Sequence, residues 1–253
     1  MNTKHLVQQQ FGLNAAAYAV SPVHARGASL ERVVELSAPQ SGDLALDVAT
    51  ATGHMAFALA PRVRKVIGLD ITVGMFAEGR RLSAERGIAN VEWLGGDVEA
   101  LPLADESFDI VMCRISLHHW PDAPRGVAEM ARVVKRGGRV VLVDNYTQED
   151  ERLAAFVNRF ETIRDPSHHW AYSIRALQGM FAAAGLRVDA TETLEKATPF
   201  LDWVKRMQTP PAAILELEAL LRTPEAAATL RGFEQNGETH FFLYEAIISA
   251  MRP

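Results

Sequence analysis

Acidic and small residues follow two neighbouring apolar runs at the points where strands would end. The run Leu44–Val48 is followed by the small residues of Ala49–Gly53, and the run Lys65–Leu69 is followed by Asp70. Apolar runs of this length with turn residues behind them are typical of covered strands in a parallel sheet. A carboxylate at a strand tip can accept hydrogen bonds from ribose hydroxyls, and small turn residues let a ligand approach the backbone. The spacing therefore predicts a nucleoside-binding strand–helix–strand unit.

Two further strand ends carry polar residues. Gly96-Asp97-Val98 follows the predicted strand Val91–Leu94, and the segment from Arg114 to His119 follows the predicted strand Phe108–Cys113. Ligands of open α/β sheets bind outside the carboxyl ends of the strands, so we expect these groups to meet at one edge. A carboxylate at Asp97 can accept a hydrogen bond from an adenine amino group while Val98 packs on the ring. The alternative is that Asp97 and Asp70 only cap a loop and a helix.

The chain around these residues alternates between strand-like and helix-like segments. Helices are predicted at His54–Ala60, Val73–Glu85 and Arg125–Val134. The last of these ends at the basic and glycine residues 135–138, and a fifth strand is predicted at Arg139–Val143. Repeated strand–helix alternation indicates a parallel sheet with helices on both faces. We therefore expect a doubly wound α/β fold.

The remaining segments are mostly helix-like, and none resembles a flexible linker, so we expect one domain over residues 1–253. Its core is expected at residues 41–146, between an N-terminal helical cap at 1–40 and helical additions with the last strands at 147–253. Beyond the core, the pattern predicts helices over 147–184 with a break at Arg164–Ser167, a strand at Leu186–Glu192, helices over Pro199–Leu230 and a strand at His240–Ile248.

The composition argues against several classes of protein. A net charge of −5 does not suit a surface built for nucleic acid, and no apolar run reaches the ~20 residues of a membrane span. Glutamines near the N-terminus stand where a secretory signal would be apolar. The single cysteine, Cys113, cannot form an intrachain disulfide, and its apolar neighbours predict burial. We expect a cytoplasmic protein without nucleic-acid or membrane partners, and a homodimer is compatible with the sequence.

Five segments together resemble a known family. They are Asp47–Gly53, Gly68-Leu69-Asp70, Gly96–Pro102, Ser107-Phe108-Asp109 and Val134–Gly138. Their order resembles the successive motifs of class I S-adenosylmethionine-dependent methyltransferases, and most of all the ubiquinone/menaquinone C-methyltransferase type. The resemblance implies a seven-stranded, mostly parallel sheet of Rossmann-like type whose last strand is antiparallel. It also implies S-adenosyl-L-methionine as cofactor and a small-molecule acceptor above its methyl group.

The resemblance assigns parts of the cofactor to particular residues. It implies that the first turn holds the methionine part, Asp70 the ribose and Asp97 the adenine. Arg114 could pair with the cofactor carboxylate or an acidic substrate, or only with acidic residues of the chain, and Tyr18 could form an aromatic lid near the sulfonium or only pack the N-terminal helix. The residues expected to contact the cofactor are Tyr18, Asp47, Ala49, Thr50, Ala51, Gly53, Asp70, Ile71, Gly96, Asp97, Val98 and Arg114.

The first turn departs from the family pattern. The family has glycine at three alternate positions, whereas here Ala49 and Ala51 occupy the first two and only Gly53 remains. A methyl group at position 51 crowds the cofactor, or costs on the order of 1 kcal/mol if its φ is positive. We expect weakened or reshaped cofactor binding rather than its loss.

Histidines are the candidate bases for an acceptor that must lose a proton. His118 and His119 follow the fourth strand, and His24 lies in the N-terminal segment. Each is alternatively a structural residue. Adjacent residues on a strand or helix point in different directions, so we expect neither this pair nor His168-His169 to form a metal site.

The sequence thus predicts an enzyme that transfers a methyl group to carbon or oxygen of a small organic molecule. Two alternatives remain open: an S-adenosylmethionine-binding enzyme of the same fold with another reaction, and a non-catalytic sensor or partner protein. A nicotinamide-dependent dehydrogenase is disfavoured because its first turn requires three glycines.

Overall fold

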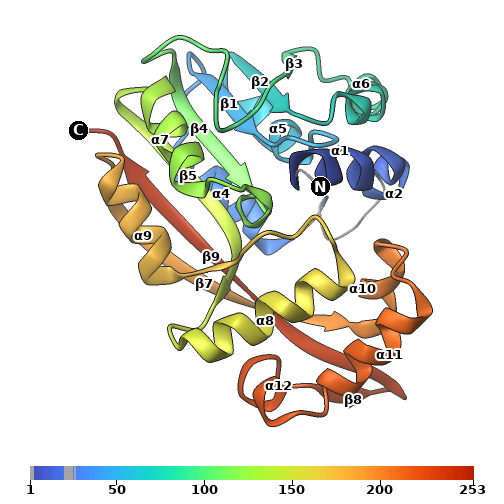
Figure 1. Cartoon of the computed structure of the whole chain (residues 1–253). Coiled ribbons are helices and arrows are strands. Elements are labelled where there is room, and N and C mark those ends of the chain that lie inside the picture. The colour runs from blue at the N-terminus through green and yellow to red at the C-terminus, as the bar shows by residue number, and fades with distance from the viewer. Residues whose placement is uncertain (1–2, 20–24, 26) are drawn as a thin grey trace.

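A mixed sheet forms the centre of the molecule (Figure 1). The computed structural model describes residues 3–19, 25 and 27–253. Seven strands follow one another in the order β3-β2-β1-β4-β5-β9-β7; the first five pair in parallel, and β9 pairs antiparallel with both β5 and β7. Their bounds are β1 Leu44–Val48, β2 Lys65–Asp70, β3 Val91–Gly95, β4 Phe108–Arg114, β5 Val134–Thr147, β7 Arg187–Pro199 and β9 Glu238–Met251.

The predicted α/β class and mostly parallel sheet are confirmed, but within the described residues the sheet has nine strands rather than seven. The short β6 (Tyr172–Ser173) pairs with β5, and β8 (Phe233–Gln235) pairs with β9. The second pairing is a hairpin at Asn236-Gly237, where both residues have positive φ. Asn-Gly is the strongest short signal for such a turn, so the sequence does carry it.

Helices cover both faces of the sheet. On one face, α4 (Ala28–Ser37) and α5 (His54–Leu59) pack their apolar sides on the strands. On the other, α7 (Ala123–Val133) and α9 (Ile174–Ala183) enclose a second apolar layer that includes Cys113, which is fully buried as predicted. Beside the strand ends lie α1 (Thr3–Leu13), α2 (Ala15–Ala19), the single-turn helices η2 (Val73–Met75) and η3 (Leu117–His119), and α6 (Phe76–Glu85).

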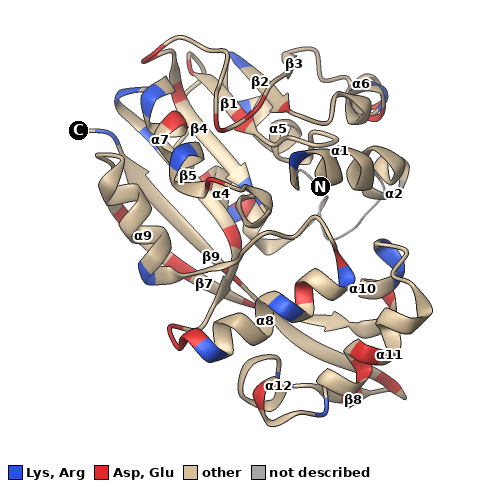
Figure 2. Cartoon of the chain, in the orientation of Figure 1, with Lys and Arg blue, Asp and Glu red and all other residues tan. Residues whose placement is uncertain are grey.

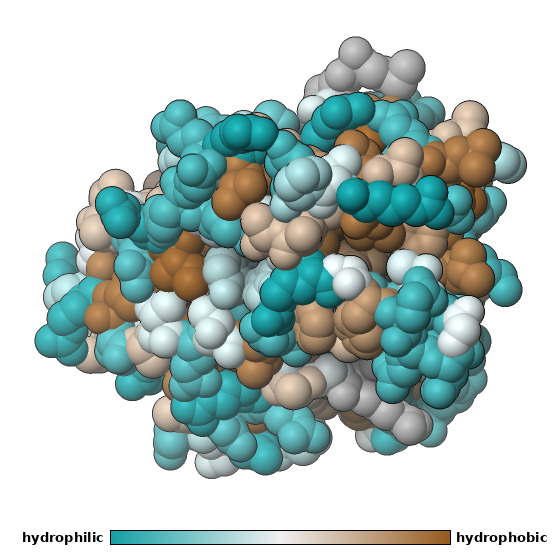
Figure 3. All heavy atoms as spheres, turned by 90° about the horizontal axis from the view of Figure 1, so that it is seen from below, coloured by the Kyte–Doolittle hydropathy of each residue, from teal (hydrophilic) through white to brown (hydrophobic). Residues whose placement is uncertain are grey.

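The long strands β7 and β9 run beyond the parallel strands and carry a second group of helices (Figure 1). These helices enclose their own apolar cluster around Phe160, Trp203 and Phe241. Seen from below, their surface shows apolar side chains interspersed with hydrophilic ones (Figure 3). The helices are α8 (Glu151–Arg164), α10 (Phe200–Arg206), α11 (Pro211–Leu220) and α12 (Pro224–Thr229).

Several predicted boundaries were wrong. The helix predicted at Arg125–Val134 ends at Val133, but the strand predicted from Arg139 begins at Val134, because Val134 pairs with Phe108 and Gly138 packs against the Asp109 carbonyl. The strands predicted at Leu186–Glu192 and His240–Ile248 are longer, since β7 and β9 pair with each other along their whole length. The helical region predicted from Pro199 to Leu230 is divided by prolines into three helices, two of which have proline in their first turn.

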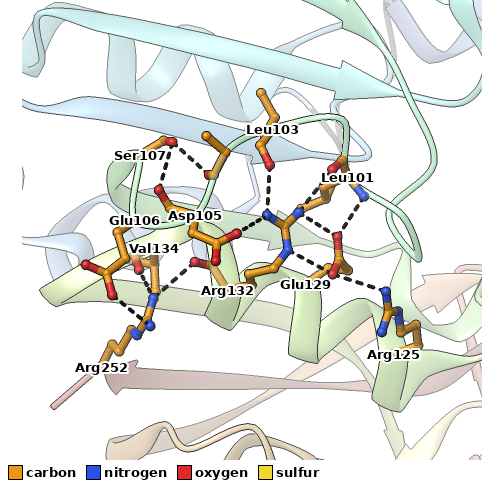
Figure 4. Close-up of polar contacts among 11 residues, drawn as sticks. Leu101, Leu103, Asp105, Glu106, Ser107, Arg125, Glu129, Arg132, Val134 and Arg252 are labelled. Carbon is orange, nitrogen blue, oxygen red and sulfur yellow. Dashed lines mark hydrogen bonds and ion pairs between the residues drawn. The ribbon is translucent and has the colours of Figure 1, made fainter.

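The loop between β3 and β4 is held by Arg132 of α7 (Figure 4). Its guanidinium donates to the carbonyl oxygens of Leu101 and Leu103 at 3.0 and 2.8 Å, and pairs with Glu129 at 2.7 Å. Glu129 in turn accepts from the Leu101 amide at 2.9 Å. Because the same loop carries Asp97, this network fixes one wall of the ligand site described below.

Acidic and basic residues are interspersed along most elements (Figure 2). In the described part of the chain, no helix has the length and apolar character needed to cross a membrane.

Candidate active site

A cavity opens at the carboxyl ends of β1, β2, β3 and β4, as the sequence predicted for this edge. We call it the first cavity. Of the predicted cofactor residues only Gly53 does not line it, and His24 lies outside the described residues. Its lining includes Tyr18, Asp47, Ala49, Thr50, Ala51, Asp70, Ile71, Gly96, Asp97, Val98, Arg114 and His119.

Asp47 supports the turn that forms the floor of the first cavity. One carboxylate oxygen accepts from the Thr50 hydroxyl at 2.6 Å and from the Ala56 amide at 3.0 Å. Burial raises the pKa of Asp47 to about 7, against these hydrogen bonds and with the help of the nearby Asp70 charge. The turn is therefore tied to both β1 and the start of α5 by one buried carboxyl group.

Asp70 braces the other side of the same turn. Its two carboxylate oxygens accept from the amides of Ala51 at 2.8 Å and Thr72 at 2.7 Å. Burial raises the pKa of Asp70, and these amides oppose the shift. A carboxylate has about four acceptor sites, so Asp70 retains capacity for ligand hydroxyls.

The alanines of the turn adopt a backbone conformation that favours glycine. Ala49 has φ 55° and Ala51 has φ 49°, both in the left-handed region. Gly53 has φ 87° as well, but a Cβ there would lie 2.5 Å from the Trp93 ring, so its role is to admit Trp93 and Phe57. The replacement of the family's first two glycines by alanine thus places two residues with a strained backbone in the lining of the first cavity.

Helix α1 forms the rim of the first cavity. Lys4 pairs with Asp97 at 2.6 Å and also with Glu99, while Gln8 donates to the Ile71 carbonyl at 3.1 Å. Phe11 packs edge-on against Tyr18, with ring centroids 5.2 Å apart, and against His119 at 5.0 Å. Asp97, which was predicted to accept a hydrogen bond from an adenine amino group, thus forms an ion pair with Lys4 of α1.

Arg114 lies in the wall of the first cavity, where its Nε donates to the Ser29 hydroxyl at 3.1 Å. Burial lowers the pKa of Arg114, while the charges of Glu245 and Asp47 oppose that shift.

A second cavity adjoins the first, because Phe11, Tyr18, Ile115 and His119 line both. Ile115 has φ 55°, a strained conformation for a β-branched residue. His118 lines the second cavity only. The strained residue thus lies where the two cavities meet.

His118 is held by Asp144 of β5. Its Nδ1 lies 2.5 Å from one Asp144 oxygen, and its amide donates to the other at 3.0 Å. Burial disfavours the charged imidazolium, but the Asp144 charge and hydrogen bond outweigh burial and raise the pKa of His118. An oriented imidazole of raised basicity is what a proton acceptor requires.

His119 has the opposite character. Its Nδ1 bonds to the Ser167 carbonyl at 3.0 Å, which requires a proton on that nitrogen and leaves the lone pair on Nε2. Burial and the His118 charge lower the pKa of His119 to about 4, so the ring is neutral at pH 7.

Three histidine rings lie close together at the second cavity. Those of His118 and His119, both on η3, are 4.2 Å apart, and His168 stacks on His118 at 5.3 Å. Within the described residues, no group of three or more histidine, cysteine, aspartate or glutamate side chains could hold a metal ion.

Comparison with known proteins identifies the family. Residues 46–142 match the model of a methyltransferase domain. YcgJ of Bacillus subtilis, named an uncharacterized methyltransferase, is 34% identical over 243 residues, which span 94% of this chain and 95% of YcgJ. The chain belongs to the class I S-adenosylmethionine-dependent methyltransferases. This methyltransferase also superimposes on the YcgJ crystal structure with a TM-score of 0.84, over 88% of this chain and 97% of that one.

A second relative is a ubiquinone/menaquinone C-methyltransferase, the type that the sequence motifs resemble. A ubiquinone/menaquinone biosynthesis C-methyltransferase of Dinoroseobacter shibae is 36% identical over 118 residues, 45% of this chain and 47% of that protein. Because this family consists of enzymes, the chain is assigned as an enzyme and not as a non-catalytic sensor or partner protein.

Sequence reasoning missed Lys4 in the methyltransferase's first cavity and the charged lining of the second. Lys4 is 93 residues from Asp97, and the charged residues of the second cavity come from segments whose periodicity predicts only helix or strand. The Arg164–Ser167 break was the one local signal near them.

Replacing Ala51 with glycine is expected to stabilise the protein. Glycine adopts φ 49° without the steric cost of a Cβ, so the free energy of unfolding should rise by about 0.5–1 kcal/mol. Denaturant unfolding measures the change. The control Ala56→Gly, within α5, should lower stability by about 1 kcal/mol. A loss of stability in Ala51→Gly would contradict the assignment of backbone strain to Ala51.

The ionisation of Asp47 is expected to make stability depend on pH. Its pKa is raised in the fold to about 7, so the stabilisation is present below the unfolded pKa of ~4 and is lost as pH rises towards 7. The stability of wild type relative to Asp47→Asn should therefore fall by a few kcal/mol between pH 4 and 7. Thermal unfolding of both proteins across this range tests it, and a constant difference would contradict it.

Proposed function

We propose that the first cavity binds S-adenosyl-L-methionine and that the second binds a small organic acceptor, which is methylated on carbon or oxygen. The observation that carries the proposal is the junction of the two cavities at four shared residues, beside the oriented His118. A reactive methyl group and its acceptor must meet at such a boundary, shielded from water.

The first cavity has groups that suit this cofactor. Asp47 and Asp70 put two carboxyl groups on its floor, where a cationic ligand offsets their mutual repulsion. The Nδ1 of His54, which lines the same cavity, is buried with no hydrogen-bond partner among the described residues. Ribose hydroxyls suit Asp70, and the adenine amino group suits Asp97 once Lys4 shares that carboxylate or moves away.

When bound, the cofactor supplies a methyl group already activated on a sulfonium. The chain has to align the acceptor, exclude water and receive a proton. We assign the proton to Nε2 of His118, since Asp144 orients the ring and stabilises its charge. His119, neutral and shared by both cavities, would accept a hydrogen bond from the acceptor and position it.

Calorimetric titration with S-adenosylmethionine and S-adenosylhomocysteine tests the cofactor site. Wild type should bind both in the micromolar range, and Asp70→Ala should bind them at least about tenfold more weakly, because hydrogen bonds to a charged group are lost. The control Asp189→Ala, which removes the Arg139 partner on β7, should bind like wild type. Failure of wild type to bind either compound would refute the proposal.

The proton-acceptor role predicts different kinetics for the two histidines. Once an acceptor is in hand, His118→Gln should lower kcat by about 10²–10⁴ and abolish its dependence on pH near neutrality. His119→Gln should act mainly on KM. S-adenosylhomocysteine affinity should stay close to that of wild type in His118→Gln, because His118 lines the second cavity and not the first. An unchanged kcat in His118→Gln would show that a group other than His118 accepts the proton.

A further inference from the structure

Within the described part of the chain, the second cavity is lined by six charged side chains from the carboxylate, lysine and arginine classes. They come from α8, the loop after it, β7, α10 and β9, so segments far apart in sequence meet here (Figures 1 and 2). The charged lining residues are Glu161, Arg164, Asp165, Lys196, Arg206 and Glu245.

Most of these charges are committed to partners within the protein. Lys196 pairs with Glu245 at 3.5 Å, and Asp165 accepts from the Ser167 hydroxyl at 2.6 Å. Arg164 donates to the Trp203 carbonyl at 3.1 Å and lies 4.8 Å from the Trp203 ring centre. These contacts explain the presence of those side chains without a ligand.

Arg206 and Glu161 each keep one atom without a partner. The Nε of Arg206 and the Oε1 of Glu161 are both buried, and no described residue offers either atom a hydrogen bond, whereas the other carboxylate oxygen of Glu161 lies 3.8 Å from the Arg164 guanidinium. Leaving a buried charged group unsatisfied costs more than the hydrogen bond would contribute, so such atoms point to a missing partner. One orphaned donor and one orphaned acceptor in the same cavity call for a ligand with complementary groups.

We propose that the second cavity binds an aromatic hydroxy acid, with its carboxylate at Arg206 and its hydroxyl at Glu161. This inference rests on the proposed function and names its acceptor class. An arginine guanidinium stays charged and matches a carboxylate in geometry. The side chains of Phe11, Tyr18 and Trp203 supply flat apolar walls for a ring.

The second cavity contains both Glu161 and His118, so the position of the ligand hydroxyl can be compared with that of the proposed proton acceptor. Burial raises the pKa of Glu161, while the charges of Arg164 and His118 oppose that shift, so Glu161 lies within the electrostatic influence of His118 in the cavity that both line. A hydroxyl bound at Glu161 would therefore lie in the part of the second cavity that the His118 charge influences. We accordingly assign the hydroxyl, and not the carboxylate, as the reacting end of the ligand.

Binding to the complex with S-adenosylhomocysteine tests the inference without any turnover. The probes are 2-, 3- and 4-hydroxybenzoate, which vary the spacing of the two groups, together with their uncharged amides and benzoate. At least one hydroxybenzoate should bind wild type ten times more tightly than its amide and than benzoate, as measured by calorimetry. Arg206→Met should abolish the preference over the amide, and Arg206→Lys should restore part of it.

The control is Arg159→Met, which removes an exposed arginine that pairs with Glu216 on the outer side of α8. It should keep the wild-type preference, and all variants should keep S-adenosylhomocysteine affinity because Arg206 does not line the first cavity. If the complex forms but binds acids and amides equally, or binds none of the probes, the acceptor class is wrong. If S-adenosylhomocysteine itself does not bind, it is the proposed function that fails.

Discussion

Two buried carboxyl groups hold the turn on which the cofactor site depends. Asp47 ties the turn to α5 through the Ala56 amide, and Asp70 ties it to the tip of β2 through the amides of Ala51 and Thr72. These bonds compel Ala49 and Ala51 into a conformation that glycine adopts more easily. The carboxyl groups also repel each other in a medium of low dielectric, so the turn carries both backbone strain and electrostatic strain. A cationic ligand would relieve the second of these.

The neighbouring strand end carries strain of the same kind. Ile115 has positive φ directly after β4, and its amide donates to the Val143 carbonyl at 2.7 Å, which anchors it to β5. Asp144 follows Val143 and holds His118. The β4–β5 pair therefore sets the boundary between the two cavities and orients the histidine beside it. Because strained residues persist only where the surroundings over-determine them, their position at this boundary supports a functional role.

The second cavity depends on the long antiparallel pair of β7 and β9. These strands extend beyond the parallel sheet and carry α8 and α10 to the histidines (Figure 1). Arg164 and Arg206 are the last residues of those two helices, where positive charge suits the helix dipole. Both arginines therefore suit the helices that carry them, whether or not a ligand binds. Within the lining of the second cavity, the Nε of Arg206 and the Oε1 of Glu161 are the buried atoms that no described residue satisfies with a hydrogen bond.

The sequence by itself determined the α/β class, the parallel core strands and the family, because apolar runs, turn residues and strand-end acids are local patterns. It also located nearly all residues of the first cavity, since the ends of parallel strands must share an edge. It did not reveal the Lys4 pairing with Asp97, the contact between the His118 and His119 rings, or the lining of the second cavity. The Lys4 pairing and the cavity lining depend on contacts between segments that lie far apart in the sequence. Tertiary packing alone brings such segments together, because the periodicity of a helix or strand shows which face is buried but not what covers it.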